Sequence, residues 1–123
     1  MRRRRLPGVL VALSVALAAC GGGSDAIRTE EASGSVADHA FTIPAGAGEA
    51  FDRGEPLEIL PGEMTVAVGE IIEIVNQDDR GHLVGPFFVG AGETLRQRFA
   101  SPGEFVGVCT VHPSGELVLV VQE

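Results

Sequence analysis

Short stretches in which apolar and polar residues alternate fill the chain from about residue 38 to its end, and Gly or Pro separates one stretch from the next. An alternation of period two predicts a β-strand with one buried face. The expected strands are 39–43, 57–60, 64–68, 71–75, 87–89, 94–99, 105–109 and 117–121. The run 71–75 is rich in β-branched residues, so we predict that it is a central strand. No segment has a helical period, and seven to eight short strands are typical of an all-β sandwich or barrel.

The N-terminus has a different pattern. Arg2 to Arg5 precede an apolar run over residues 6–19, which is the length of a secretory signal core and too short for a membrane-spanning helix. The run ends in Leu-Ala-Ala-Cys20-Gly, which resembles the lipobox of bacterial lipoproteins. The alternative is simple cleavage without a lipid. The arginine run leaves the export route open.

These features divide the chain into three parts. Residues 1–19 form a signal peptide, 20–37 a lipidated Cys20 followed by a small, polar, flexible linker, and 38–123 a β-sandwich domain. Two or more acyl chains would hold the protein firmly at a membrane. We therefore predict a lipid-anchored protein on the extracytoplasmic face of a bacterial cell membrane.

The charge of the mature chain restricts its partners. Without Arg2 to Arg5, five arginines and no lysine stand against 17 acidic residues, a net charge of −12. Such a chain does not bind nucleic acid, and an anionic lipid surface repels it, so the membrane is reached through the lipid anchor alone. The acidity serves solubility or attracts a cationic redox partner.

Lipidation of Cys20 leaves Cys109 as the only thiol, so no intramolecular disulfide is possible. A lone cysteine in an exported chain is a small buried residue, a nucleophile or a metal ligand. Cys109 belongs to the segment Cys-Thr-Val-His112, which an apolar strand precedes and a Pro-Ser-Gly turn follows. A thiol and an imidazole at this spacing can bind one metal ion.

A second histidine, His82, lies 27 residues before Cys109, far enough for a hairpin and a return strand to bring the two together. One thiolate with two imidazoles is the ligand set of a trigonal blue-copper site. Zinc is an alternative, although structural zinc takes four protein ligands and usually several thiolates. A cysteine nucleophile with a histidine base is another, but the pattern has neither a helix N-terminus to lower the thiol pKa nor an oxyanion-hole loop.

The segment from about Pro61 to Glu123 resembles a family, the cupredoxins, which are small plastocyanin-like blue-copper proteins. The resemblance rests on residues 61–70, on Asn76-x-Asp78 followed by His82, on Ser-Pro-Gly-Glu-Phe before Cys109-x-x-His112, and on the closing run 116–121. It implies a Greek-key β-sandwich that binds one copper ion through His82, Cys109 and His112. It also implies that the outer edge of His112 faces solvent and passes the electron.

The sequence departs from this family at the weak axial ligand. The two common positions of the axial methionine fall on Gly115 and Leu117, neither of which can ligate. We expect Leu117 on the axial side, with the backbone oxygen of Gly81 as a remote donor, and a raised reduction potential. Met64 we assign to core packing. Asn76 is expected to support the site by a hydrogen bond near the Cys109 loop, or else to favour a turn.

The predicted function is electron transfer by a monomer that meets a redox or copper-handling protein transiently. The alternatives are a copper carrier or scavenger and a metal-free interaction sandwich. An enzyme is not expected, because a type-one copper has no open position for substrate. We expect an apolar docking patch around His112, a core position for Phe88, Phe99 and Phe105, and a surface or strand-end position for His39. The predicted patch residues are Leu83, Gly85, Pro86, Phe87, Val111 and Pro113.

Overall fold

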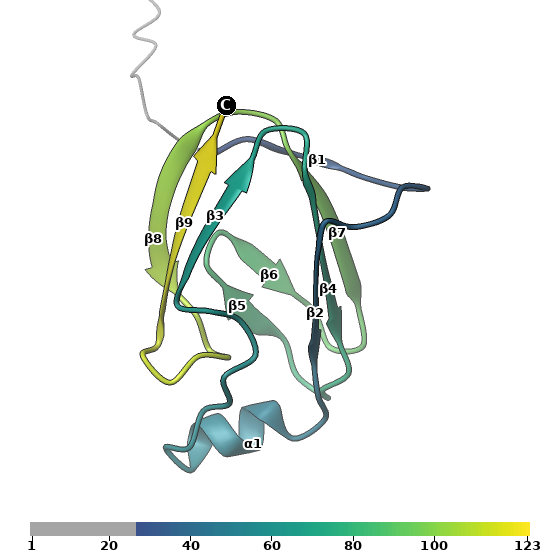
Figure 1. The fold of residues 1–123 in the computed structure, drawn as a ribbon. Coiled ribbons are helices and arrows are strands. Elements are labelled where there is room, and N and C mark those ends of the chain that lie inside the picture. Colours follow the sequence, from purple (N-terminus) through teal and green to yellow (C-terminus); the bar gives the residue numbers. More distant parts are fainter. Residues whose placement is uncertain (1–26) are drawn as a thin grey trace, which may run out of the picture.

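The computed structural model describes residues 27–123, which form nine strands and one short helix (Figure 1). The elements are β1 (Thr29–Glu31), β2 (His39–Ile43), α1 (Ala47–Asp52), β3 (Glu63–Ala67), β4 (Ile71–Asn76), β5 (His82–Val84), β6 (Phe87–Val89), β7 (Thr94–Phe99), β8 (Gly103–Val108) and β9 (Glu116–Gln122).

The strands form two main sheets and a small ribbon. One sheet has the order β1-β7-β4-β2 and the other the order β3-β9-β8, whereas β5 and β6 pair only with each other. In Figure 1 the two sheets stand on either side of the molecule, with the β5–β6 ribbon between them. A single bridge between Val84 and Cys109 joins this ribbon to the end of β8. The predicted central strand, β4, does lie between two neighbours.

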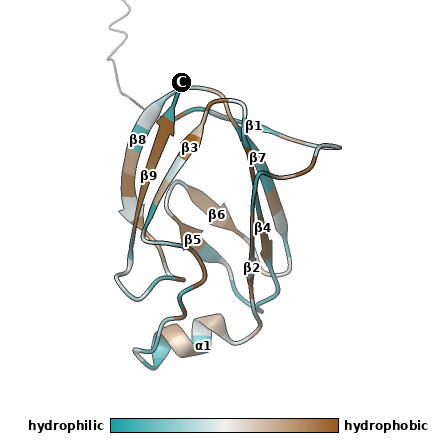
Figure 2. Cartoon of the chain, viewed as in Figure 1, coloured by the Kyte–Doolittle hydropathy of each residue, from teal (hydrophilic) through white to brown (hydrophobic). Residues whose placement is uncertain are grey.

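Alternation along the strands builds the core. In β9, Leu117, Leu119 and Val121 are buried while Glu116 and Gln122 are exposed, as a strand with one face against a core requires. The β1-β7-β4-β2 sheet contributes Ile72, Ile74 and Phe99 to the same cluster. Figure 2 shows hydrophobic colour on strands of both sheets. Met64 is buried in this cluster, so its predicted role in core packing is confirmed.

The predicted all-β sandwich is confirmed, with nine strands in place of seven to eight. The prediction that there is no helix was wrong, because residues 47–52 form α1. The N–H groups of Gly46 and Gly48 at its start donate to the carboxylate of Asp78, at 3.1 and 2.8 Å. This helix therefore depends on a residue 30 positions further along the chain, which a local pattern does not reveal.

One predicted strand and one predicted boundary also differ from the structure. Residues 57–60 form no strand. The Ile59 N–H donates to the Val111 carbonyl at 3.0 Å and Leu60 is buried, but no ladder of hydrogen bonds forms. The predicted linker extended to residue 37, yet Thr29–Glu31 form β1, which pairs with Gln97–Phe99 of β7. The domain therefore includes a strand that starts about nine residues before the predicted boundary.

The predicted signal peptide, Cys20 and the first part of the predicted linker lie outside the described residues. Among residues 27–123, no helix has the length and apolar character needed to cross a membrane.

Candidate metal centre

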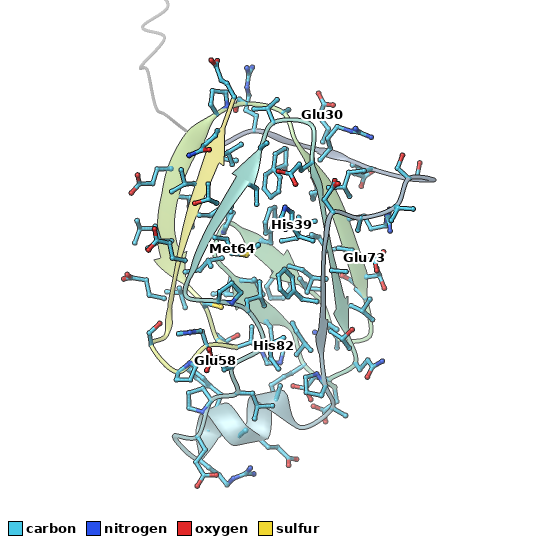
Figure 3. The ribbon with its side chains drawn as sticks, viewed as in Figure 1. Glu30, His39, Glu58, Met64, Glu73 and His82 are labelled. Atoms are coloured by element: carbon cyan, nitrogen blue, oxygen red, sulfur yellow. The ribbon has the colours of Figure 1, made fainter. Side chains whose placement is uncertain are left out.

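Three segments from different parts of the chain meet at the end of the sandwich where α1 lies (Figure 1). They are the loop 77–81 between β4 and β5, the turn 109–115 between β8 and β9, and the segment 53–62 that leads from α1 to β3. A backbone hydrogen bond from Ile59 to Val111 joins the second and third segments, and another from Val118 of β9 to Gly62 holds the end of the third segment against that strand. Figure 3 shows His82 and Glu58 at this end, with His39 further up the sandwich.

Asn76, the last residue of β4, organises the loop before His82. Its side chain is buried, and its amide nitrogen lies within hydrogen-bond distance of the carbonyls of Arg80 (2.9 Å), Gly90 (3.0 Å) and Val89 (3.2 Å). Its carbonyl oxygen accepts the N–H of Asp78 at 2.9 Å. Asn76 therefore supports the 77–81 loop. The predicted hydrogen bond near the Cys109 loop is wrong, because these partners take both amide hydrogens.

His82 and Asp78 form a buried pair four residues apart. His82 is 2% exposed and Asp78 4%, and His82 Nε2 lies 2.7 Å from Asp78 Oδ2. Burial alone would raise the pKa of Asp78, but hydrogen bonds from His82 and from the N–H groups of Gly48, Gly46 and Asp79 outweigh it and hold that pKa well below its ordinary value. Asp78 is therefore an ionised carboxylate that fixes the orientation of the imidazole.

The other ring nitrogen of His82 faces the Cys109 segment. His82 Nδ1 lies 2.9 Å from the hydroxyl of Thr110, the residue after Cys109. In the tautomer whose Nε2–H donates to the ionised Asp78, the lone pair of His82 lies on Nδ1 and faces the Thr110 hydroxyl, which also lies 3.3 Å from the Leu83 carbonyl.

Cys109 follows the last residue of β8 and is fully buried as a free thiol. Its backbone N–H donates to the Gly115 carbonyl at 2.9 Å, which closes the turn. Burial raises the pKa of the Cys109 thiol, and a hydrogen bond from the Val111 backbone opposes this. The thiol therefore stays protonated and inert toward electrophiles at neutral pH, which disfavours a nucleophilic role.

His112 is half-buried and rests against the backbone of Gly62. A Cβ atom at Gly62 would lie 3.1 Å from His112 Cε1, so glycine at this position allows the close approach. His112 Nδ1 accepts the Ser114 N–H at 3.1 Å and lies 2.7 Å from the Ser114 hydroxyl. Since a backbone N–H donates to it, Nδ1 of His112 also has the lone pair.

Both histidines thus use the same nitrogen, Nδ1, toward a hydroxyl on the 109–115 turn. The hydroxyls of Thr110 and Ser114 can rotate away, whereas three backbone N–H groups fix the Asp78 carboxylate that contacts His82. In residues 27–123, no three His, Cys, Asp or Glu side chains lie close enough together to hold a metal ion. The histidines and Cys109 are brought to one end of the fold, but their side chains do not converge on a single point.

Leu117 and Gly115, the two positions considered for an axial ligand, have different environments. Leu117 is 1% exposed and belongs to the same buried cluster as Cys109, Val84 and Val111. Gly115 has a φ of 72°, a left-handed conformation that a methionine would adopt only with strain. At Gly81, a Cβ atom would lie 2.4 Å from the Phe88 ring, so that ring covers the backbone beside His82.

The predicted docking patch is only partly at the surface. Leu83 is 44% exposed and Pro113 is exposed, but Val111 and Phe87 are buried in the core and cannot contact a partner. Phe88, which we expected in the core, is 63% exposed because it lies opposite Leu83 on the outer side of the β5–β6 ribbon.

The other core and surface predictions hold. Phe99 is fully buried and Phe105 packs against the core. His39 begins β2 and pairs with Glu70 at 2.9 Å, as expected of a strand-end histidine.

Sequence reasoning missed four residues of this region. Asp78 stands four residues before His82, and an acidic residue so close to a candidate ligand is a usable signal for a carboxylate–histidine pair. Thr110 and Ser114, which contact the two imidazoles, carry no sequence signal, and neither does Gly62.

No family model matches this sequence, and no curated protein is similar enough to count as a relative. Solved structures that resemble the fold include a purple cupredoxin from Nitrosopumilus maritimus, with 20% identity, a TM-score of 0.45, and coverage of 69% of this chain and 100% of that one. Amicyanin from Paracoccus versutus has 18% identity, a TM-score of 0.44, and coverage of 81% of this chain and 94% of that one. A reduced Cu(I) form of an amicyanin variant has 17% identity, a TM-score of 0.42, and coverage of 81% and 95%.

Proposed function

We propose that this protein binds one copper ion through His82, Cys109 and His112 and transfers electrons. The observation that carries the proposal is the buried Asp78–His82 pair, because histidines that ligate metals commonly donate their other ring N–H to a carboxylate. The pair leaves the Nδ1 lone pair of His82 directed toward the residue next to the free, buried thiol of Cys109.

Copper at this position would accept and release one electron by changing its oxidation state. The chain would supply the frame. Asp78 holds His82 in one orientation, the core around Leu117 excludes water from Cys109, and the bridge between Val84 and Cys109 ties the two ligand segments together. A rigid frame of this kind limits the rearrangement that accompanies electron transfer.

The donor set favours copper over zinc. One thiolate and two imidazoles suit a blue-copper site, whereas structural zinc takes four protein ligands. Leu117, which is buried in the same core cluster as Cys109, offers no fourth ligand. Because the pKa of the Cys109 thiol is raised, a metal must displace the thiol proton in order to bind. Copper has the higher affinity for such ligands and therefore displaces the proton more readily than zinc.

The location we propose rests on the sequence. Removal of residues 1–19 and lipidation of Cys20 would place the domain on the extracytoplasmic face of a bacterial membrane. The lipid anchor would be its only contact with that membrane. The intact mass of the protein from the membrane fraction tests this, since acyl chains add a defined mass to the mature chain that begins at Cys20.

Titration of the purified protein with copper(II), followed by absorption and metal analysis, tests the function. We expect one copper per chain and an intense thiolate-to-copper band that Cys109→Ser abolishes. Cys20→Ser, the matched control, keeps the band because Cys20 lies outside the domain. If reduced Cys109 is demonstrated and copper still gives no band, the copper proposal is wrong and an interaction sandwich without metal takes its place.

A copper carrier is the second candidate, and the exposed side of His112 favours it. His112 is held by Ser114 and Gly62 alone, so this ligand could release metal to another protein. Exchange with a competing chelator separates the two functions. Loss of copper within seconds indicates a carrier, whereas retention over hours with a reversible redox couple indicates electron transfer.

A further inference from the structure

A continuous apolar stripe runs across the outer side of β8 and onto the β5–β6 ribbon. Of the seven large hydrophobic side chains that are exposed among residues 27–123, four lie on it. They are Val106 (54%), Val108 (56%), Leu83 (44%) and Phe88 (63%). Four exposed apolar side chains in one row are a feature of interaction sites more than of a solvated surface.

The strand register places these residues on one outer face, with Leu83 opposite Thr110 and Val108 opposite Gly85. Val106 and Val108 are two apart on β8 and therefore share a face. The bridge between Val84 and Cys109 turns both of those residues inward, so Leu83 emerges on the same outer side as Val108. Leu83 in turn stands directly opposite Phe88.

Acidic residues edge this stripe. Glu116 pairs with Val108 across the two strands, and Glu104 lies on the same face of β8, two residues from Val106. Both are exposed, and neither makes an ion pair within the part of the chain described. The arginines of residues 27–123 all lie off β3, β5, β6, β8 and β9; they are Arg28, Arg53, Arg80, Arg96 and Arg98.

We propose that this stripe docks a protein partner whose contact face has an apolar centre and a basic rim. The charge pattern selects this occupant, because a second copy would bring glutamates against glutamates and an anionic membrane would be repelled. Docking itself needs no metal. Its use for electron transfer rests on the proposed function. The stripe would bring a partner close to the copper, because Leu83 follows the proposed ligand His82 and Val108 precedes the proposed ligand Cys109.

A basic c-type cytochrome, with lysines around its exposed haem edge, is a suitable probe. The metal-free protein, labelled with ¹⁵N, is titrated with this cytochrome at low salt and the amide shifts are mapped. We expect shifts on β8, β5 and β6, and weaker binding as salt rises. The same cytochrome with its lysines acetylated, which removes their charge, should not bind.

Variants then test the stripe itself. Val106→Ser combined with Val108→Ser should weaken binding by about tenfold, since both substitutions remove apolar area that the partner would bury. Glu104→Gln with Glu116→Gln should weaken it by about threefold at low salt and flatten the salt dependence. Phe51→Ser and Val68→Ser remove exposed apolar side chains elsewhere and should leave binding unchanged.

Other outcomes would overturn the proposal. Shifts centred on residues 112–114 or on the β1-β7-β4-β2 sheet would place the docking surface elsewhere, and unchanged affinity of the Val106 and Val108 variant would remove the stripe from it. Equal binding of the acetylated cytochrome would exclude the basic rim. Dimerisation through the stripe in ultracentrifugation, or binding to phosphatidylcholine vesicles that the serine variant loses, would assign it another occupant. Because the titration uses metal-free protein, failure here is distinguishable from failure to bind copper.

Discussion

The two halves of the candidate centre are built differently. On one side, His82 is buried and held by Asp78, whose carboxylate also accepts N–H groups from the start of α1 and from Asp79. On the other side, His112 is half-buried, and Ser114, two residues away, supplies its hydrogen bonds. The hydrogen bonds of the first half span 30 residues of chain, whereas those of the His112 side chain stay within one turn and its contact with Gly62 is one of packing.

This difference indicates how a metal would be acquired. The Asp78–His82 pair is in place beforehand, so it supplies a preorganised ligand. The 109–115 turn can adjust by rotating Thr110 and Ser114, and it would close on the ion. Substitutions around Asp78 should therefore lower stability and copper affinity strongly, and substitutions around His112 should lower them only slightly.

Asp78→Asn should have the largest effect. It places an NH₂ group among N–H donors, and we expect the free energy of unfolding of the metal-free protein to fall by about 2 kcal/mol in chemical denaturation. Copper affinity should fall about 10- to 100-fold in a chelator competition.

The control for Asp78→Asn is Asp79→Asn, since the Asp79 side chain is 86% exposed. Equal effects of the two substitutions would show that Asp78 does nothing more than contribute charge.

Acid should remove the stabilisation that the Asp78 carboxylate gives the metal-free protein. The pKa of Asp78 is lowered in the folded state, so the unfolded chain binds the proton first as pH falls. The stabilisation is complete above the ordinary pKa of about 3.9 and is lost as pH falls below it. Between pH 7 and pH 3, the free energy of unfolding should fall more steeply for the wild type than for Asp78→Asn. Parallel pH dependences of the two proteins would show that Asp78 does not have a lowered pKa in the folded state.

Leu117→Met tests the axial position. The exchange conserves volume and should cost less than about 1.5 kcal/mol of stability. If Leu117 faces the copper, a thioether there stabilises Cu(II) and lowers the reduction potential, by about 59 mV for each tenfold change in relative affinity. Voltammetry measures this, and Leu119→Met, at a buried position two residues along the same strand, is the control. An unchanged potential in Leu117→Met would show that this residue is not axial.

Gly62→Ala should have the smallest effect. The new Cβ would press on the His112 ring, which must shift by a few tenths of an ångström. Because His112 is held locally, we expect a change in stability below about 1 kcal/mol and a small shift of the copper absorption band. A loss of stability as large as that of Asp78→Asn would mean that the two halves are equally rigid.

The sequence predicted most of the strands because burial and alternation coincide in them, as in β3, β4 and β9. It could not predict α1, since Asp78 accepts the hydrogen bonds from the start of this helix, or β1, which exists by pairing with β7. Phe88 was misplaced because an exposed aromatic on a short ribbon has the same local pattern as a buried one.

For the centre, residue types and spacing pointed to His82, Cys109 and His112, and that ligand set stays a prediction. Spacing says nothing about which ring nitrogen is available or about what holds it. Asp78, Thr110 and Ser114 determine this, and their contacts depend on rotamers and on the packing of separate loops.

In the copper site that we propose, Nδ1 of His82, Nδ1 of His112 and the sulfur of Cys109 bind one ion. ¹⁵N NMR of the histidine rings during titration with Cu(I), which is diamagnetic, reports on each ring nitrogen. We expect both Nδ1 resonances to shift at one equivalent of metal while Nε2 of each ring keeps its proton. Metal-induced loss of the Nε2 proton of His82, or a titration that leaves His82 unchanged, would contradict it.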